Sequence, residues 1–291
     1  MPVANAKSLL IEATRSGYAV GAFNVTSLVQ MEAAVEAAAM RKAPLIVQVS
    51  AKTAQFLQAE VVAAAFKALA QSAPVPLGLH LDHCTEVSYC KRCADAGFTS
   101  IMIDASKQSL SENIRQTREV CDYCHARGDI AVEGELGTVS GVEDHIRVGE
   151  GEAVLCDPAQ ALELVEATGV DFLAPAIGTA HGVYKTADPV IDVERFEHIA
   201  RLINGGRLRA PLVVHGGTGL PPRTVRRLIA AGGSKFNVST DFKHTLIDTT
   251  YDYITAHRQE FEPVKIDAAV KTATIAKMQQ WMDLLGCSGK A

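Results

Sequence analysis

The stretch Leu79-His80-Leu81-Asp82-His83 decides the fold, because it closes an apolar run that begins at Pro76 and ends in two ionisable side chains. A short continuous apolar run is typical of a strand that is buried on both faces, as parallel strands are. Two adjacent ionisable side chains at the end of such a strand cost free energy unless they bind something. In a barrel of parallel strands, sites are built at the carboxyl ends. We therefore expect Asp82 and His83 to lie at that end of a parallel barrel.

Seven further apolar runs alternate with segments of helical spacing on both sides of this stretch. The predicted strands are 20–25, 45–50, 76–81, 100–104, 130–136, 172–178, 211–214 and 235–239. The predicted helices are 8–14, 27–40, 53–71, 87–96, 112–126, 158–168, 193–204, 221–231 and further helices to about residue 285. The segments 137–157 and 179–192 are expected to be loops, which at this length are often functional.

Eight strand–helix alternations in 291 residues predict an α/β fold, a TIM (β/α)8 barrel with extra terminal helices. No domain boundary is visible, so we expect one domain over residues 1–291. An open doubly wound sheet is the alternative. It would carry a Gly-x-Gly-x-x-Gly turn after an early strand, and the sequence has none there.

The composition is that of a globular protein with a large core. Hydrophobic residues make up 48% of the chain and the net charge is −5, so no basic field favours nucleic acid or a membrane surface as a partner. Residues 1–15 lack the apolar core of a signal peptide, and the alanine-rich run 61–66 is too short to span a bilayer. A cytoplasmic location is expected.

The seven cysteines are an odd number, which argues against a disulfide framework. Two Cys-x-x-Cys pairs, Cys90/Cys93 and Cys121/Cys124, fall within segments of helical spacing. We expect reduced, partly buried thiols there. A structural zinc site is the alternative, but it requires turns that these segments lack. The spacing Cys121-x-x-Cys124-His125 also fits haem attachment, which requires export.

Polar residues stand at or just past the carboxyl ends of most predicted strands. They are Asn24, Ser50, Asp82, His83, Asp104, Glu135, His181, His215 and Asn237. Each alone has a structural explanation, such as capping a helix, but together they converge on one face. Three of them are histidines, and neutral imidazole is the nitrogen ligand that zinc prefers. The pattern therefore predicts a catalytic zinc site beside Asp82.

Two later segments indicate phosphate binding. His215-Gly216-Gly217-Thr218-Gly219 follows the seventh strand, and Asn237-Val238-Ser239-Thr240 follows the eighth. The loops after these strands form the usual phosphate site of the barrel, where glycines let backbone N–H groups approach an anion.

With these motifs, the chain resembles the class II, zinc-dependent ketose-bisphosphate aldolases of the fructose- and tagatose-bisphosphate type. The matching stretches are 21–24, 81–84, 102–106, 132–137, 178–182, 214–219 and 237–240. The resemblance implies that His83, His181 and His215 bind the catalytic Zn²⁺, that Asp82 is the acid/base, and that Asp104 and Glu135 serve a second divalent position. A monovalent cation, Na⁺ or K⁺, is implied near the loop after His181.

The resemblance also implies a site for dihydroxyacetone phosphate and a second acid/base. The substrate-binding residues are expected to be Asn24, Ser50, Gly182, Lys185, Gly216, Gly217, Thr218, Asn237, Val238, Ser239 and Thr240. Glu143 corresponds to the family's mobile-loop glutamate, although the neighbouring Asp144 leaves the register open by one residue.

Three alternatives remain open. A class I mechanism would use a desolvated lysine, and no predicted strand carries one inside, since Lys235 only begins the eighth strand. A non-catalytic partner subunit should lack ligands or the acid/base. A zinc hydrolase on the same barrel would not need the phosphate loops.

The sequence indicates the type of reaction more clearly than it indicates which sugar phosphate is the substrate. Family members that act on bisphosphates carry an arginine in the segment entering the final helix, whereas residues 262–268 here contain Lys265 and no arginine. The substrate is thus expected to be a small sugar phosphate, either a ketose 1,6-bisphosphate or a related ketose 1-phosphate. The alanine-rich helices and the family imply a homodimer or homotetramer.

Overall fold

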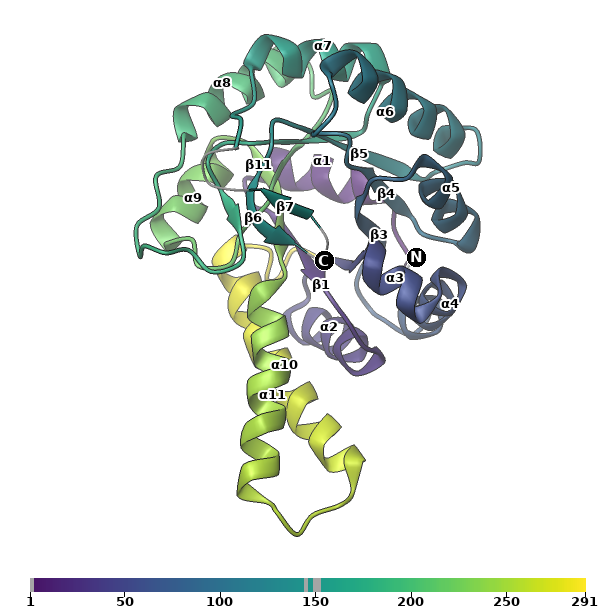
Figure 1. Cartoon of the computed structure of the whole chain (residues 1–291), viewed down its shortest axis with the longest axis vertical. Coiled ribbons are helices and arrows are strands. Elements are labelled where there is room, and N and C mark those ends of the chain that lie inside the picture. Colours follow the sequence, from purple (N-terminus) through teal and green to yellow (C-terminus); the bar gives the residue numbers. More distant parts are fainter. Residues whose placement is uncertain (1–2, 144–145, 149–152) are drawn as a thin grey trace.

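The computed structural model describes residues 3–143, 146–148 and 153–291, and its centre is a closed barrel of eight parallel strands. Around the barrel the strand order is β1-β11-β10-β8-β5-β4-β3-β2. The strands are β1 (Val20–Asn24), β2 (Leu45–Ser50), β3 (Leu77–Cys84), β4 (Ser100–Ile103), β5 (Ala131–Leu136), β8 (Phe172–Pro175), β10 (Leu212–Val214) and β11 (Gly233–Val238). The predicted TIM barrel is confirmed (Figure 1).

Helices follow the barrel strands and form the outer ring (Figure 1). They are α1 (Ala6–Ser16), α2 (Leu28–Arg41), α3 (Ala51–Leu57), α4 (Ala59–Ala70), α5 (Val87–Ala96), α6 (Leu110–His125), α7 (Pro158–Thr168), α8 (Val193–Asn204), α9 (Pro222–Ala230), α10 (Thr240–Ala256) and α11 (Pro263–Leu285). The single helix predicted over 53–71 is wrong, because Gln58 adopts φ +70° and separates α3 from α4.

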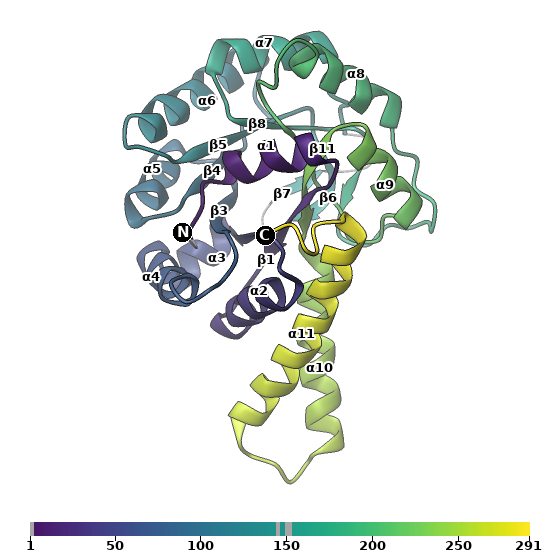
Figure 2. The same cartoon turned by 180° about the vertical axis from the view of Figure 1, so that it is seen from behind.

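Helix α1 closes the amino-terminal end of the barrel. It packs against β1, β3 and β11, and Ala4 N–H donates to the Leu77 carbonyl at the start of β3. Figure 2, seen from behind Figure 1, shows α1 lying across the barrel. Any site in this barrel must therefore open at the opposite end, where the strands finish.

The two segments predicted as loops contain a small second sheet. Strands β6 (Ser140–Glu143) and β7 (Ile146–Val148) form an antiparallel hairpin, and β6 also pairs in parallel with β9 (Ala180–His181). The sequence at 137–157 is polar and contains glycines, so it lacks the hydrophobic pattern that predicts a strand. The pairing is non-local, since Gly141 lies opposite His181, 40 residues later in the chain.

The last two helices form an arm that projects beyond the helical ring (Figure 1). The barrel end of the arm packs against α2 and α9, while the turn between α10 and α11 lies at its far end. Of the 17 residues of α10, only Phe242 is buried. The arm also carries exposed apolar side chains, namely Ile247, Tyr251, Ile254, Phe261 and Val264.

No described helix is both long and apolar enough to cross a membrane. All seven cysteines are buried free thiols, and the two Cys-x-x-Cys pairs lie on α5 and α6 as expected. Burial raises the pKa of the Cys93 and Cys124 thiols to about 12, so both are protonated at neutral pH.

Candidate active site

A bulge at the end of β3 turns two adjacent side chains into the barrel mouth. Successive residues of a strand normally point to opposite faces, but the register of β3 against β4 shifts between Leu81 and Cys84. His83 sits in this bulge with φ +45°, a conformation that non-glycine residues adopt rarely. Asp82 and His83 are consequently both buried at the same end of the barrel.

The three predicted imidazoles meet at this point. The ring centroids of His83 and His181 are 4.9 Å apart, those of His83 and His215 are 4.7 Å apart, and those of His181 and His215 are 5.8 Å apart. One nitrogen from each ring lies within 4.8 Å of the others. His181 belongs to β9 of the small sheet rather than to a barrel strand, so the second sheet supplies one of the three rings.

Two carboxylates border the imidazoles. His83 Nδ1 is 2.9 Å from Asp104 Oδ2, and Asp104 Oδ1 also accepts from the Ser106 backbone N–H and hydroxyl. Glu135 Oε2 lies 3.8 Å from His83 Nδ1 and 3.4 Å from His215 Nδ1. Burial and the nearby Asp104 raise the pKa of Glu135 well above its usual value, although His83 opposes this shift.

His215 is held by a carboxylate that the sequence analysis missed. Its Nε2 donates to Glu133 Oε1 at 2.8 Å, which leaves Nδ1 as the lone-pair nitrogen. Burial lowers the pKa of His215 to about 4, Glu133 opposes this and His83 adds to it, so the ring is neutral at pH 7. A neutral imidazole whose other nitrogen donates to a carboxylate is the usual form of a metal ligand.

The donor set fits a divalent metal. His215 Nδ1 and Glu135 Oε2 are buried and have no hydrogen-bond partner among the described residues. Buried polar atoms normally have partners, so these two atoms indicate a ligand between them. His83, Asp104 and Glu135 form a second possible ligand set that shares His83 with the three imidazoles.

Asp82 is held by two side-chain amides. Asn24 Nδ2 donates to Asp82 Oδ2 at 2.9 Å, and Asn237 Nδ2 donates to Asp82 Oδ1 at 3.3 Å. Asn24 is itself oriented by Gln48, whose Nε2 donates to Asn24 Oδ1 at 2.9 Å. The carboxylate is thus fixed beside the imidazoles, and Gln48 is a second residue that the sequence analysis missed.

Glycines bring the loop after β10 into contact with β9 and with the end of β11. Gly216 has φ +69°, and a Cβ there would lie 2.4 Å from the Ala180 carbonyl oxygen. A Cβ on Gly217 would lie 2.7 Å from the Asn237 carbonyl oxygen, which accepts the Gly217 N–H. These positions require glycine, and through them the residues before His181 and after His215 lie against each other.

The start of α10 completes a possible anion cradle. Ser239 is the N-cap residue of this helix, yet its side chain makes no capping bond, and its buried hydroxyl has no partner among the described residues. Thr218 Oγ1 accepts from the Asp241 backbone N–H at 3.4 Å, which joins the two loops. A helix N-terminus with an unused hydroxyl and neighbouring glycines suits a phosphate.

Tyr184 joins the two histidine-bearing loops and was not singled out from the sequence. Its hydroxyl donates to the Gly216 carbonyl at 2.9 Å and accepts from the Ala180 N–H at 3.1 Å. Burial raises the pKa of Tyr184 to about 12, which keeps the hydroxyl protonated. An aromatic residue three positions after His181 was the only sequence signal of this role.

The expectation that no strand carries an interior lysine is wrong. Strand β11 begins at Gly233, so Lys235 is its third residue, and its side chain is fully buried inside the barrel. Its Nζ lies 2.9 Å from Glu133 Oε2 and donates to Asn237 Oδ1 at 2.7 Å. An amine held in an ion pair at zero exposure is not available to form a Schiff base with a substrate carbonyl.

The remaining predicted residues lie around this centre. Ser50 caps α3 and pairs in register with Asp82, Val238 ends β11, and Thr240 begins α10. Gly182 is half-buried with φ +91°, and Lys185 is exposed on the loop after β9. The backbone of Glu143 pairs with Ile146 at the end of β6, while Asp144 lies outside the described residues.

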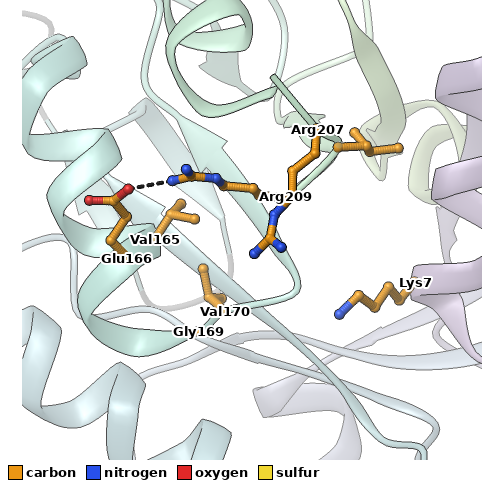
Figure 3. Close-up of a pocket in the computed structure, with 8 residues that line it drawn as sticks. Lys7, Val165, Glu166, Gly169, Val170, Arg207 and Arg209 are labelled. Carbon is orange, nitrogen blue, oxygen red and sulfur yellow. Dashed lines mark hydrogen bonds and ion pairs between the residues drawn. The ribbon is translucent and has the colours of Figure 1, made fainter. Parts of the chain in front are cut away.

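A separate cavity has no lining residue from the histidine cluster. It measures about 640 Å³ and is lined by Lys7, Val165, Glu166, Gly169, Val170, Arg207, Leu208 and Arg209 (Figure 3). Arg209 is paired with Glu166, and Lys7 Nζ lies 2.7 Å from Asp171. Its lining has no imidazole, thiol or hydroxyl side chain, so the site is assigned to the mouth instead.

Comparison with solved structures identifies similar folds over nearly the whole chain. A protein from Coccidioides immitis, provisionally assigned as a fructose-1,6-bisphosphate aldolase, is 31% identical with a TM-score of 0.88, covering 98% of this chain and 97% of that one. The YdjI aldolase from Escherichia coli K12 is 28% identical with a TM-score of 0.85, covering 99% of both chains. Fructose-bisphosphate aldolase from Campylobacter jejuni shares the fold at 22% identity and a TM-score of 0.85, covering 99% of this chain and 97% of that one.

A family model gives the same assignment. The model for class II fructose-bisphosphate aldolases matches residues 4–290. Since the match spans almost the entire sequence and includes every residue of the histidine cluster, this protein belongs to the class II fructose-bisphosphate aldolase family.

Proposed function

We propose that this protein is a zinc-dependent lyase. It reversibly cleaves a ketose 1,6-bisphosphate of the fructose or tagatose type, or a related ketose 1-phosphate, into dihydroxyacetone phosphate and an aldehyde. The observation that carries the proposal is the convergence of the imidazoles of His83, His181 and His215 beside the carboxylate of Asp82.

The three imidazoles would hold the zinc ion. Neutral ligands leave the ion its full charge, and a site with three protein ligands keeps a position for substrate. When bound, zinc supplies a localised positive charge that stabilises the negative charge developing on the ketone half of the substrate. Asp104 and Glu135 would serve a second divalent position, and a Na⁺ or K⁺ ion would bind near the loop after His181.

Asp82 would move the proton of the cleaved hydroxyl. Retro-aldol cleavage requires a base for the hydroxyl on the carbon that leaves as the aldehyde, and in condensation the same group returns the proton. Asp82 suits this role because its oxygens accept from Asn24 and Asn237, which fix the plane of the carboxylate. Glu143 at the end of β6 would act on the carbon proton of the ketone half, since β6 pairs directly with the strand of His181.

The cradle formed by the Gly216–Thr218 segment and the start of α10 would bind the phosphate of the ketone half. Residues 262–268 contain no arginine that could clamp a phosphate on the aldehyde half, although Arg223, Arg226 or a side chain of another subunit could substitute. Residues 262–268 lie at the far end of the arm, where Lys265 is paired with Glu260 (Figure 1). Their distance from the barrel mouth means that they could meet a substrate only in another subunit, so a ketose 1-phosphate is included among the substrates.

The arm also supports the proposal that the protein is a homo-oligomer. A helix is stabilised in water mainly by packing an apolar face, and α10 has only one buried residue in the single chain. Ile247 is 63% exposed and Tyr251 is 69% exposed on this helix. We expect the arm of a second copy to cover them, and light scattering of Tyr251→Asp should then show a smaller species than the wild-type protein.

The decisive experiment is a zinc titration of the purified protein, coupled to an enzymatic assay for dihydroxyacetone phosphate. The proposal expects product formation from ketose phosphates to rise with zinc and saturate near one ion per chain. Zinc binding with no cleavage of any ketose phosphate would indicate a non-catalytic partner subunit instead. Release of inorganic phosphate without dihydroxyacetone phosphate would indicate a hydrolase.

A further inference from the structure

The ammonium group of Lys235 lies deep inside the barrel. Lys235 and Glu133 are both 0% exposed, and the Nζ–Oε2 distance between them is 2.9 Å. Taking a lysine and a glutamate out of water costs several kcal/mol per ion, and the pairing must offset this cost. An ion pair with this desolvation cost, in contact with residues that hold the site, requires an explanation.

On one side, Lys235 fixes the carboxylate that orients His215. Glu133 Oε2 faces Lys235, which leaves Oε1 to accept the His215 Nε2–H at 2.8 Å. His80 Nε2, at 3.5 Å from Oε2, is itself held through its Nδ1 by the Ser100 hydroxyl at 2.7 Å. Because Nε2 carries the proton, Nδ1 of His215 must present its lone pair to the imidazole cluster.

On the other side, Lys235 fixes the amide that orients Asp82. An ammonium group has only donors, so it must face the oxygen of the Asn237 amide, which it does at 2.7 Å. The amide nitrogen then points at Asp82 Oδ1, 3.3 Å away. Without the ammonium only the hydrogen bond to Asp82 would hold this amide, so its orientation would be less well fixed.

We propose that Lys235 is a positioning residue that couples the orientation of His215 to that of Asp82 through Glu133 and Asn237. This inference rests on the proposed function, because it takes His215 as a zinc ligand and Asp82 as the acid/base. It extends that function because one buried cation would orient both the zinc ligand His215 and the acid/base Asp82.

The barrel supplies a matched control on its other side. Gln48 is fully buried and orients Asn24 as Lys235 orients Asn237, since its Nε2 donates to Asn24 Oδ1 and Asn24 Nδ2 donates to Asp82. Gln48 is linked to Glu133 and His215 through Asp82, Asn237 and Lys235, whereas Lys235 contacts Glu133 directly. Loss of Gln48 should therefore affect Asp82 far more than His215.

The test compares three single variants by zinc affinity, measured by chelator competition, and by kcat. Lys235→Met should weaken zinc binding by about 10- to 100-fold, as loss of an outer-shell partner does, and lower kcat by about 10- to 100-fold through misplacement of Asp82. Gln48→Met should lower kcat similarly and leave zinc affinity within about twofold. Glu133→Gln keeps the acceptor for His215, so it should change zinc affinity less than Lys235→Met does.

A double variant separates positioning from mere structural support. Lys235→Met leaves Glu133 buried without its cation, which destabilises the fold, whereas Lys235→Met/Glu133→Gln removes both charges. In the double variant we expect the melting temperature and zinc affinity to recover toward the wild-type values. We expect kcat to remain reduced, because nothing holds the oxygen of Asn237. Recovery of kcat together with stability would overturn the proposal.

Two further outcomes are decisive. Zinc affinity and kcat of Lys235→Met within about twofold of the wild-type values would also overturn the coupling. Zinc affinity is measured without catalysis, so a wild-type protein that binds zinc but cleaves no ketose phosphate overturns the proposed function only. In that case weaker zinc binding by Lys235→Met, and not by Gln48→Met, still supports the link from Lys235 to His215.

Discussion

The barrel mouth and the 640 Å³ cavity both gather ionisable residues, but they differ in how those residues are satisfied. In the mouth, His83 and His215 are 4% and 2% exposed, and His215 Nδ1 has no hydrogen-bond partner among the described residues. In the cavity, Arg207 and Arg209 are exposed, and Arg209 is already paired with Glu166 (Figure 3).

The difference shows that the chemistry of a site depends on how its polar atoms are satisfied. A solvated cation beside a carboxylate has little free energy left to give to a ligand. A buried donor atom without a partner keeps the full cost of its desolvation, which a ligand can relieve. The space around the imidazoles is therefore the reactive one, and the predictions below test this contrast.

The largest effect should come from the imidazoles. His83→Ala, His181→Ala and His215→Ala should each lose bound zinc and lower kcat by about 10³-fold or more, because several kcal/mol of charge stabilisation depend on the ion. Elemental analysis and the coupled assay measure the two losses. A fully active preparation that contains no divalent metal would contradict the mechanism.

The next effect separates the acid/base from the metal ligands. Asp82→Ala should retain zinc and lose carbon–carbon cleavage by about 10²-fold or more, the usual contribution of a general base. The matched comparison is His215→Ala, which should lose both properties. If Asp82→Ala also loses its zinc, then Asp82 is a ligand rather than a base.

A smaller effect is expected from the hairpin. Glu143→Ala should slow hydrogen exchange between dihydroxyacetone phosphate and solvent by about 10- to 100-fold, as loss of an acid/base does. Asp144→Ala serves as the control for register and should leave the exchange rate unchanged. Equal effects of the two substitutions on the exchange would show that the loop residue has been misassigned.

The two phosphates of the substrate should contribute unequally to kcat/KM. Removing the phosphate on the aldehyde half should lower kcat/KM by less than about 10³-fold, which corresponds to about 4 kcal/mol. Removing the phosphate on the ketone half should cost more, because the cradle at Gly216–Thr218 and α10 would bind it. A ketose 1,6-bisphosphate and its 1-phosphate provide the first comparison. A preference above 10³-fold would reveal a second clamp, in the same chain or in a partner's arm.

The cavity variants should have the smallest effect. Arg207→Ala and Arg209→Ala should leave zinc content and kcat/KM unchanged, and alter the free energy of unfolding by at most about 1 kcal/mol, as for an exposed ion pair. Chemical denaturation and the coupled assay measure these quantities. A loss of activity in either variant would show that the contrast between the two regions is wrong.

The barrel strands were predictable because most of their residues are apolar, so they appear as short hydrophobic runs that need no partner to be recognised. The hairpin β6–β7 and strand β9 were not, because polar residues there become strands only by pairing with each other. The break at Gln58 was missed since the alanine-rich pattern continues through it.

Within the site, residues at strand ends were found and those one layer deeper were not. His80, Glu133 and Lys235 each precede a predicted site residue by two positions, which places their side chains on the same inner face. That spacing was the available signal. It was overlooked for Lys235 because the strand was taken to begin there rather than at Gly233.

The sequence by itself determined the order of strands and helices, the residue types at the strand ends, and the glycines that allow close contact. These depend on local hydrophobic pattern and backbone freedom, which neighbouring residues set. The tertiary structure alone decided which polar atoms meet. Asn237 reaches Asp82 across 155 positions and His215 reaches Glu133 across 82, so their hydrogen bonds exist only after the barrel closes. The bulge that turns His83 beside Asp82 likewise depends on the register between β3 and β4, a contact between strands that no single stretch of sequence contains.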